Sequence, residues 1–172
     1  MATADEVLEF IAVDGVRSQE LARLLPFQRA VFACCCAQRL LDAKDAGGDH
    51  PLAQRAVRLA WDLALGDSTE DPEPVLDELE ALGEELDQDA LAASFYALAT
   101  AARGGAETAA WAGQRGTDHA FELLDRSDRS YRPLEVDAID PIVQREYLAQ
   151  RSDLDRVSSA ESSSSLAELR LH

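Results

Sequence analysis

The amino-acid sequence predicts an all-α fold: a single-domain helical bundle of about seven helices with short connections. Three observations lead to this prediction. Alanine and leucine dominate the composition, and both are strong helix formers, whereas the 172 residues include only 9 glycines and 6 prolines. Apolar residues recur at helical spacing along most of the chain. Glycines, prolines and capping residues divide it into segments of helical length.

The first quarter of the chain is expected to hold one or two short helices and one long one. Residues 4–13 are either a short helix or an extended lead-in. Ser18 is the expected N-cap of a short helix over 19–25, because its hydroxyl can accept a bond from an unpaired backbone amide. Pro26 either ends that helix or occupies the first turn of the next, which is predicted over 27–46 and closed by a glycine pair.

Three helices are expected in the middle of the chain. One begins at Pro51, carries an apolar stripe and ends at Gly66. The second, over 75–86, places valine and leucine inward and acidic residues outward. The third, over 90–103, ends at another glycine pair. The expected N-caps are Asp49 or His50 for the first of these helices, and Asp87 or Asp89 for the third.

The last third of the chain predicts two further helices around a polar loop. Residues 106–125 are helical and rich in alanine and glycine, which lets a neighbouring helix approach closely. Residues 126–138 are predicted to be a polar loop. A helix capped by Asp140 then begins at Pro141.

The C-terminal residues set the expected domain division. Residues 1–157 form the helical bundle. Residues 158–172 are either a serine-rich stretch before a short C-terminal helix or a frayed continuation of the last helix.

The net charge of −17 limits the partners that this chain can bind. Residues 59–102 hold 12 acidic residues and no basic one, so most of the excess lies in one segment. Phosphate recognition needs clustered lysine and arginine, so no nucleic acid is expected as a partner. An anionic membrane surface would repel the chain, and no apolar run is long enough to span a bilayer. A basic protein, in contrast, would be attracted.

The three cysteines are consecutive, at positions 34–36. An odd number without spacing is no disulfide framework. On one helix their side chains point about 100° apart, so they cannot converge on one metal ion. They are expected to be small buried side chains in a reducing cytoplasm.

The run LARLLPFQRAVFACCCAQRLL at 21–41 resembles the opening of the YjaG-like family of small bacterial helical proteins. The family usually has Trp before its Gln and Glu before its Arg, and this chain departs from both. Residues 88–125 and 140–147 are similar to the family's central helices and last helix, whereas the serines at 158–165 interrupt the usual continuous last helix. The resemblance implies an all-α fold and supplies no activity or catalytic residues. The residues of this chain that occupy the family's motif positions are Phe27-Gln28, Phe32 and Gln38-Arg39.

Catalytic motifs are absent from the sequence, and no cofactor is expected. His119 and Glu122 lie one helical turn apart, with Asp118 beside them, and could supply two metal ligands. A second such pair is missing, so no metal site is predicted. Arg39 and Arg58 lie among small apolar residues. Either could pair with an acid of the central segment, and an internal structural pair is expected rather than a ligand site.

These features favour a non-catalytic, acidic protein-binding module of the immunity or antitoxin type. The chain is not expected to be an enzyme. It would neutralise a basic partner such as a toxin. The alternative is an enzyme, or a protein that binds a small molecule or metal, with a pocket between helices at Gln28, Arg39, His119 and Glu122. A third reading is a homodimer with helix 106–125 at its interface. The expected partner-binding residues are Asp77, Glu78, Glu80, Glu84 and Glu85.

Overall fold

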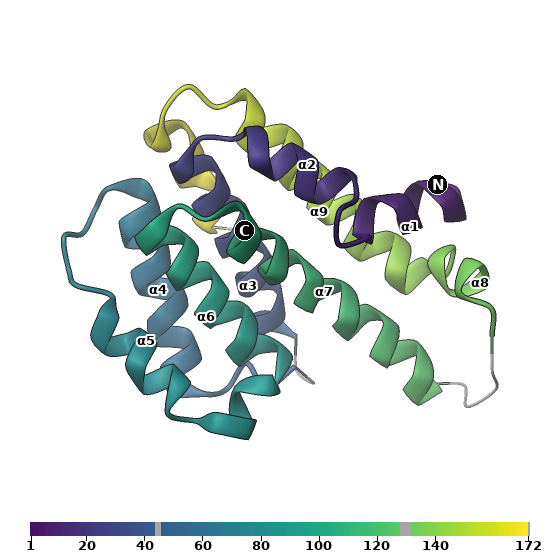
Figure 1. Cartoon of the computed structure of the whole chain (residues 1–172), viewed down its shortest axis with the longest axis horizontal. Helices are drawn as coiled ribbons and strands as arrows, with labels where there is room; N and C mark the ends of the chain where they lie inside the picture. The colour runs from purple at the N-terminus through teal and green to yellow at the C-terminus, as the bar shows by residue number, and fades with distance from the viewer. Residues whose placement is uncertain (44–45, 128–131, 172) are drawn as a thin grey trace.

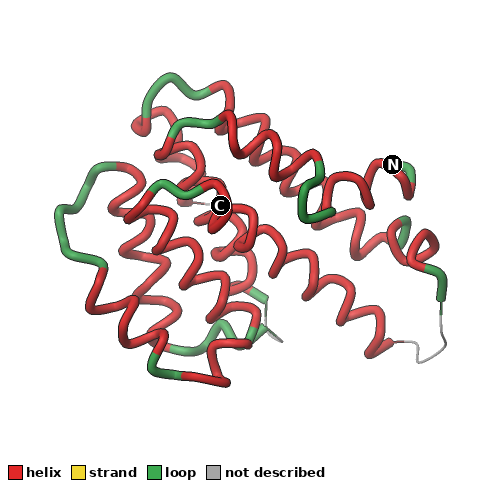
Figure 2. The backbone as a smooth tube through the Cα atoms, in the orientation of Figure 1, coloured by secondary structure: helices red, strands yellow, loops and turns green. Residues whose placement is uncertain are grey.

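The computed structural model describes residues 1–43, 46–127 and 132–171, and all of the regular structure in these ranges is helical (Figures 1 and 2). The all-α class is therefore confirmed, although the described residues form nine α-helices and two 3-10 segments instead of the expected seven or so. In chain order they are α1 (Ala4–Ile11), α2 (Val16–Arg23), α3 (Pro26–Asp42), α4 (Pro51–Leu65), α5 (Glu73–Glu80), η1 (Gly83–Asp87), α6 (Asp89–Arg103), α7 (Ala106–Ser127), α8 (Leu134–Ala138), α9 (Pro141–Ser159) and η2 (Ser163–Leu171).

Helix α3 forms the centre of the bundle and contacts α4, α6, α7 and α9. Most of its residues are buried, including all three cysteines. Alanines line the facing surfaces of α3, α4 and α6, so these helices pack closely around few aromatic side chains. Helix α7 runs between this group and α9, which lies with α1 and α2 on its other side (Figure 1).

A second, smaller apolar cluster lies at the other end of α7. It joins α1, α7, α8 and α9 and holds α8 in place. None of the helices in the described ranges is both long and apolar enough to cross a membrane. The buried members of the second cluster are Val7, Ala120, Leu124, Ala138 and Val143.

Several helix ends lie where local signals predicted them. His50 is the N-cap of α4, and its Nδ1 accepts a bond from the Leu52 amide at 3.2 Å. Pro51 follows at the first helical position, and Gly66 ends the helix with a left-handed φ of 81°. Asp140 caps α9 with its carboxylate. Each of these signals acts within a few residues, so sequence alone reveals it.

Other boundaries were predicted wrongly. The N-cap of α2 is Gly15, not Ser18. Ser18 is already a residue of the helix, and its hydroxyl donates to the Val13 carbonyl at 2.6 Å. Helix α3 ends at Asp42; residues 44–45 of the predicted helix lie outside the described residues. The N-cap of α6 is Gln88, because Asp89 is already the first helical residue and turns its side chain toward α7.

The segments 75–86 and 126–138 also differ from expectation. The single helix predicted over 75–86 is α5 followed by η1, and Gly83, with φ of 58°, lies at the change of direction. The predicted loop over 126–138 is partly helical, since α7 continues to Ser127 and α8 begins after Pro133. Residues 128–131 lie outside the described residues.

The C-terminal segment packs on the bundle. Helix α9 ends at Ser159, and the serines at 163–165 begin the 3-10 segment η2. Leu166 and Leu169 are buried in the same core as α3 and α4, so η2 shares the hydrophobic core of the bundle.

Candidate functional site

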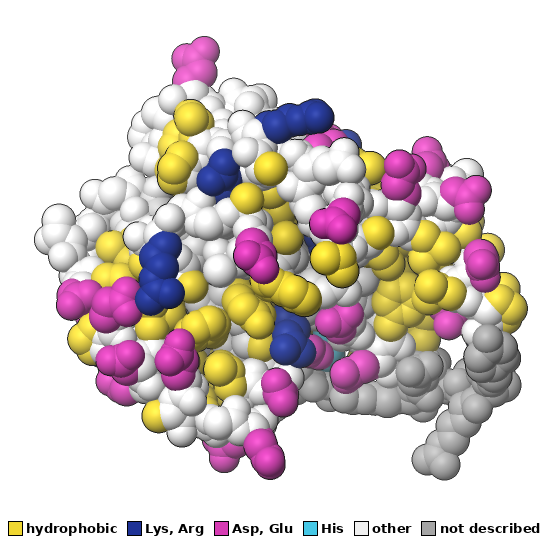
Figure 3. Space-filling view, viewed as in Figure 1, with side chains coloured by type: hydrophobic (Ala, Val, Ile, Leu, Met, Phe, Trp, Pro, Cys, Tyr) yellow, Lys and Arg dark blue, Asp and Glu magenta, His cyan; other side chains and the backbone are white. Residues whose placement is uncertain are grey.

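The five acidic residues predicted to bind a partner are all exposed, on α5 and η1. Val75, Leu76 and Leu79 of α5 are buried, and this stripe turns the intervening acids outward. Acidic side chains gather over this end of the molecule in Figure 3. We name the surface formed by Asp77, Glu78, Glu80, Glu84 and Glu85 the acidic face.

Few positive charges balance the acidic face. Arg55 pairs with Glu78 at 3.2 Å, and both side chains are about half exposed, so water screens this pair. Within the described ranges, the other four carboxylates have no basic partner within 4.0 Å. The last turn of α5 holds acids and no basic residue, although negative charge at a helix C-terminus opposes the helix dipole. The charges of this face are therefore solvated and available.

The four residues of the predicted pocket do not form one site. Gln28 lies at the start of α3, where its Oε1 accepts from the Leu25 amide at 2.8 Å. Its Nε2 donates to the Ala160 carbonyl at 3.0 Å, just after α9. Gln28 is buried, and it ties these two helix ends together. Its position and bonds are those of a structural residue.

Arg39 pairs with two acids of α9 rather than with the central segment. Its guanidinium bonds Glu146 at 3.2 and 3.3 Å and forms a closer pair with Asp153. Arg39 therefore makes the internal pair that was expected, but its acids lie on α9 and not in residues 59–102. Arg58 is exposed and makes no ion pair with any other described residue. Burial raises the pKa of Asp153 above its ordinary value, even though Arg39 opposes this.

A second buried arginine extends this polar network. Arg17 is only 1% exposed, and its guanidinium donates to Gln150 at 3.0 Å and to Gln114 at 2.6 Å. Gln150 also donates to Glu146 at 2.8 Å, so the network links α2, α7, α9 and α3. Sequence analysis did not identify Arg17, because only the folded chain shows that α2 lays it against α7 and α9. Arg39 pairs directly with both acids of α9, whereas Arg17 bonds amide and hydroxyl groups, which suits an internal structural network.

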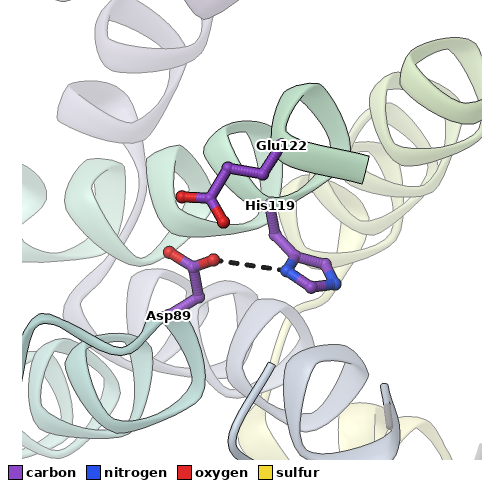
Figure 4. Close-up of side chains that lie close together, drawn as sticks. All are labelled: Asp89, His119 and Glu122. Atoms are coloured by element: carbon purple, nitrogen blue, oxygen red, sulfur yellow. Dashed lines mark hydrogen bonds and ion pairs between the residues drawn. The ribbon is translucent and has the colours of Figure 1, made fainter. Parts of the chain in front are cut away.

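His119 and Glu122 meet a third residue that sequence analysis considered only as a helix cap. Asp89, at the start of α6, lies with its Oδ2 3.2 Å from His119 Nδ1 (Figure 4). Potential ligand atoms of Asp89, His119 and Glu122 all lie within 4.8 Å of one another. Asp89 and His119 are buried, and Glu122 is exposed. No local pattern shows this proximity, since packing of α6 on α7 brings together residues 30 positions apart.

Burial and nearby charges shift the pKa of Asp89. Burial raises the pKa of this carboxyl, and the negative charge of Glu122 raises it further, whereas His119 and Arg115 oppose the change. The nearest Arg115 nitrogen lies 3.9 Å from Asp89, which is too far for a hydrogen bond. The three side chains are thus a half-buried group with more acidic than basic character.

Arg39 and His119 line one pocket. It has a volume of about 350 Å³ and lies between α3, α7 and α9. Arg145 and Glu146 line it from α9, and Ile142 supplies an apolar wall. Gln28 and Glu122 do not line this pocket. Half of the predicted pocket residues therefore share a cavity, which has both charged and apolar walls.

The alanine- and glycine-rich side of α7 packs within the chain. Ala109, Ala112 and Ala120 are buried against the neighbouring helices. This side of α7 is therefore not free to form the homodimer interface for which it was suggested. Dimerisation through another surface stays a prediction. His172 lies outside the described residues.

Comparison with known proteins identified no relative of this chain. The resemblance to the YjaG-like family consequently stays a prediction, carried by the residues quoted above. Searches found no matching family model, no matching curated protein and no matching solved structure.

Proposed function

We propose that this chain is a non-catalytic, acidic protein-binding module of the immunity or antitoxin type. It neutralises a basic protein, such as a toxin, by docking the acidic face on it. One observation carries the proposal: five exposed carboxylates project from α5 and η1, and among the described residues a single exposed arginine, Arg55, pairs with one of them. The proposed location is the cytoplasm, which suits three free, buried cysteines.

The way in which α5 is anchored supports a docking role. Its buried valine and leucine side chains pack on α4 and α6, so the acids stand on a fixed support. A fixed group of like charges attracts a basic surface over a distance and raises the association rate most at low salt. Acids in the last turn of α5 disfavour the helix itself, so stability does not explain their placement.

The test compares the native chain with two variants of equal charge. The face variant carries Asp77→Asn, Glu78→Gln, Glu80→Gln, Glu84→Gln and Glu85→Gln. The control variant also changes one aspartate and four glutamates, all exposed and remote from the face: Asp5→Asn, Glu9→Gln, Glu107→Gln, Glu135→Gln and Glu161→Gln. Each immobilised protein captures partners from native cytosol, and a salt gradient elutes them for mass spectrometry.

The expected result is one basic protein that the native chain and the control variant capture and the face variant loses. With that protein purified, its association rate with the native chain should fall steeply as salt rises. Capture by the face variant, or an association rate that salt does not change, would contradict the proposal. Failure of the native chain to capture any basic protein at low salt would also count against it.

The pocket lined by Arg39 and His119 favours a second candidate function, the binding of a small ligand between helices. A ligand that binds only the native state must raise the melting temperature. A thermal-shift screen with nucleotides and other small anions should show such a rise for the native chain and none for Arg39→Gln. Unchanged melting temperatures across the panel would eliminate this candidate.

A further inference from the structure

We propose that Asp89, His119 and Glu122 form a binding site for one divalent transition-metal ion, of which Zn²⁺ and Mn²⁺ are the best-suited examples. This site is separate from the acidic face: it lies where the start of α6 packs on α7 (Figure 4). The inference does not depend on the proposed docking function.

The spacing of the three groups suits a shared ion. Ligand atoms about 2.0–2.2 Å from one ion lie roughly 3–4.4 Å from each other. The corresponding atoms of Asp89, His119 and Glu122 lie within 4.8 Å of one another, and Asp89 Oδ2 is 3.2 Å from His119 Nδ1. A small rotamer adjustment therefore brings all three groups into coordination distance.

The packing of α6 on α7 holds the backbone of the three residues in place. His119 and Glu122 lie three positions apart, so they point to one side of α7, toward the first residue of α6. The faces of α6 and α7 beside these residues are packed with buried alanine and leucine side chains. Two buried ligands and one exposed ligand give a site that is held in place and still open to an entering ion.

The electrostatics of the group also favour a cation. The carboxylates of Asp89, which is buried, and Glu122, which is exposed, lie within 4.8 Å of each other. His119 Nδ1 lies 3.2 Å from Asp89 Oδ2, and the nearest Arg115 nitrogen lies 3.9 Å from Asp89. A bound divalent ion would replace the repulsion between the carboxylates with attraction to both.

The ligand set indicates the class of ion. Imidazole nitrogen suits zinc and other transition metals, whereas Mg²⁺ and Ca²⁺ prefer sites of oxygen alone. One imidazole with two carboxylates therefore favours Zn²⁺ or Mn²⁺ over the alkaline-earth ions. Three protein ligands also leave room for a water or an external ligand.

The experiment is calorimetric titration of the full-length protein with Zn²⁺, in excess Mg²⁺ to occupy weak sites on the acidic face. Mn²⁺ serves as the second probe, because it has little affinity for thiols and the chain holds three free cysteines. The site variants are His119→Asn, which keeps an N–H donor near Asp89, and Glu122→Gln, which changes an exposed residue. The controls are His50→Asn, which keeps a capping side chain on α4, and Glu84→Gln on the acidic face.

We expect one ion per chain, with an affinity at least 10-fold weaker in each site variant and unchanged in both controls. Loss of an outer-shell partner already costs about 10–100-fold, so loss of a direct ligand should cost no less. Circular dichroism without metal shows whether each variant is folded, and Glu122→Gln tests the site even if His119→Asn unfolds. Equal affinities in the native chain and in Glu122→Gln, or absence of a one-to-one binding event, would overturn the proposal.

Discussion

Gly116 of α7 lies directly against the carboxylate of Glu146 of α9: a Cβ built at position 116 would come 2.5 Å from Glu146 Oε1. That same carboxylate forms an ion pair with Arg39 of α3 and accepts a hydrogen bond from Gln150 Nε2 at 2.8 Å. The missing side chain of Gly116 therefore makes the space in which three helices share one polar network. Helix propensity alone would favour alanine at this position.

Gly116→Ala is accordingly expected to destabilise the protein. Overpacking costs about 1–3 kcal/mol, and the better helix propensity of alanine offsets up to about 1 kcal/mol of it. We expect a net loss of roughly 1–2 kcal/mol in the free energy of unfolding, measured by urea denaturation.

A double-mutant cycle with Glu146→Ala supplies the control, because that change removes the atom with which the new methyl group collides. In the Glu146→Ala background, Gly116→Ala should cost nothing or stabilise the helix. An equal cost in both backgrounds would show that the close contact is not the reason for glycine here.

Arg39→Met should cost about 2–4 kcal/mol at neutral pH, because it leaves Glu146 and Asp153 without their cation. Their side chains are 17% and 12% exposed, so the cost lies near the lower range for breaking a buried pair. Arg55→Met is the matched control: its pair with Glu78 is half exposed, and its loss should cost at most about 0.5 kcal/mol.

The cost of Arg39→Met should also depend on pH. Burial already raises the pKa of Asp153, and Arg39 is the main group that lowers it, so removing Arg39 raises this pKa further. A carboxyl whose pKa is raised by folding binds its proton more tightly in the folded state, so stability is lost as pH rises through that pKa. The deficit of the variant should therefore shrink as pH falls from 7 toward the ordinary value of 3.8. Denaturation curves that show a constant deficit would contradict this.

The three cysteines should be unreactive in the folded protein. Cys34 and Cys36 are fully buried and Cys35 is 7% exposed. Burial raises the pKa of all three thiols, that of Cys36 to about 12, so almost no reactive thiolate exists at neutral pH. A thiol reagent should label all three in denaturant and label native protein at the rate of unfolding. Rapid labelling of any cysteine in native protein would show that α3 is more open than the structure has it.

The sequence predicted those parts of the fold that depend on neighbouring residues. The start of α4 at His50 and Pro51, its end at Gly66 and the acidic outer side of α5 all follow from patterns a few residues long. Helix α8 was missed because five helical residues are too short to show a period. The candidate metal group needed Asp89, whose nearness to His119 is a property of tertiary packing alone.

The acids of α5 themselves are expected to lower stability. Glu80 ends the helix, where its charge opposes the dipole and no basic residue is present in the last turn. Glu80→Gln should raise the free energy of unfolding by about 0.3–1 kcal/mol at low ionic strength, and added salt should remove most of that gain.

Glu73→Gln, at the other end of α5, is the matched control with the opposite sign. Its negative charge lies in the first turn, where the dipole favours it, and it pairs with Arg103 at 3.0 Å. This change should lower stability by a similar amount. If Glu80→Gln stabilises and Glu73→Gln destabilises, the acids of the last turn reduce the stability of the helix that carries them. Their presence then requires a role outside the fold, such as the docking of a basic partner. If Glu80→Gln leaves stability unchanged at low salt, this argument for a docking role fails, and the salt-dependent capture experiment alone must decide it.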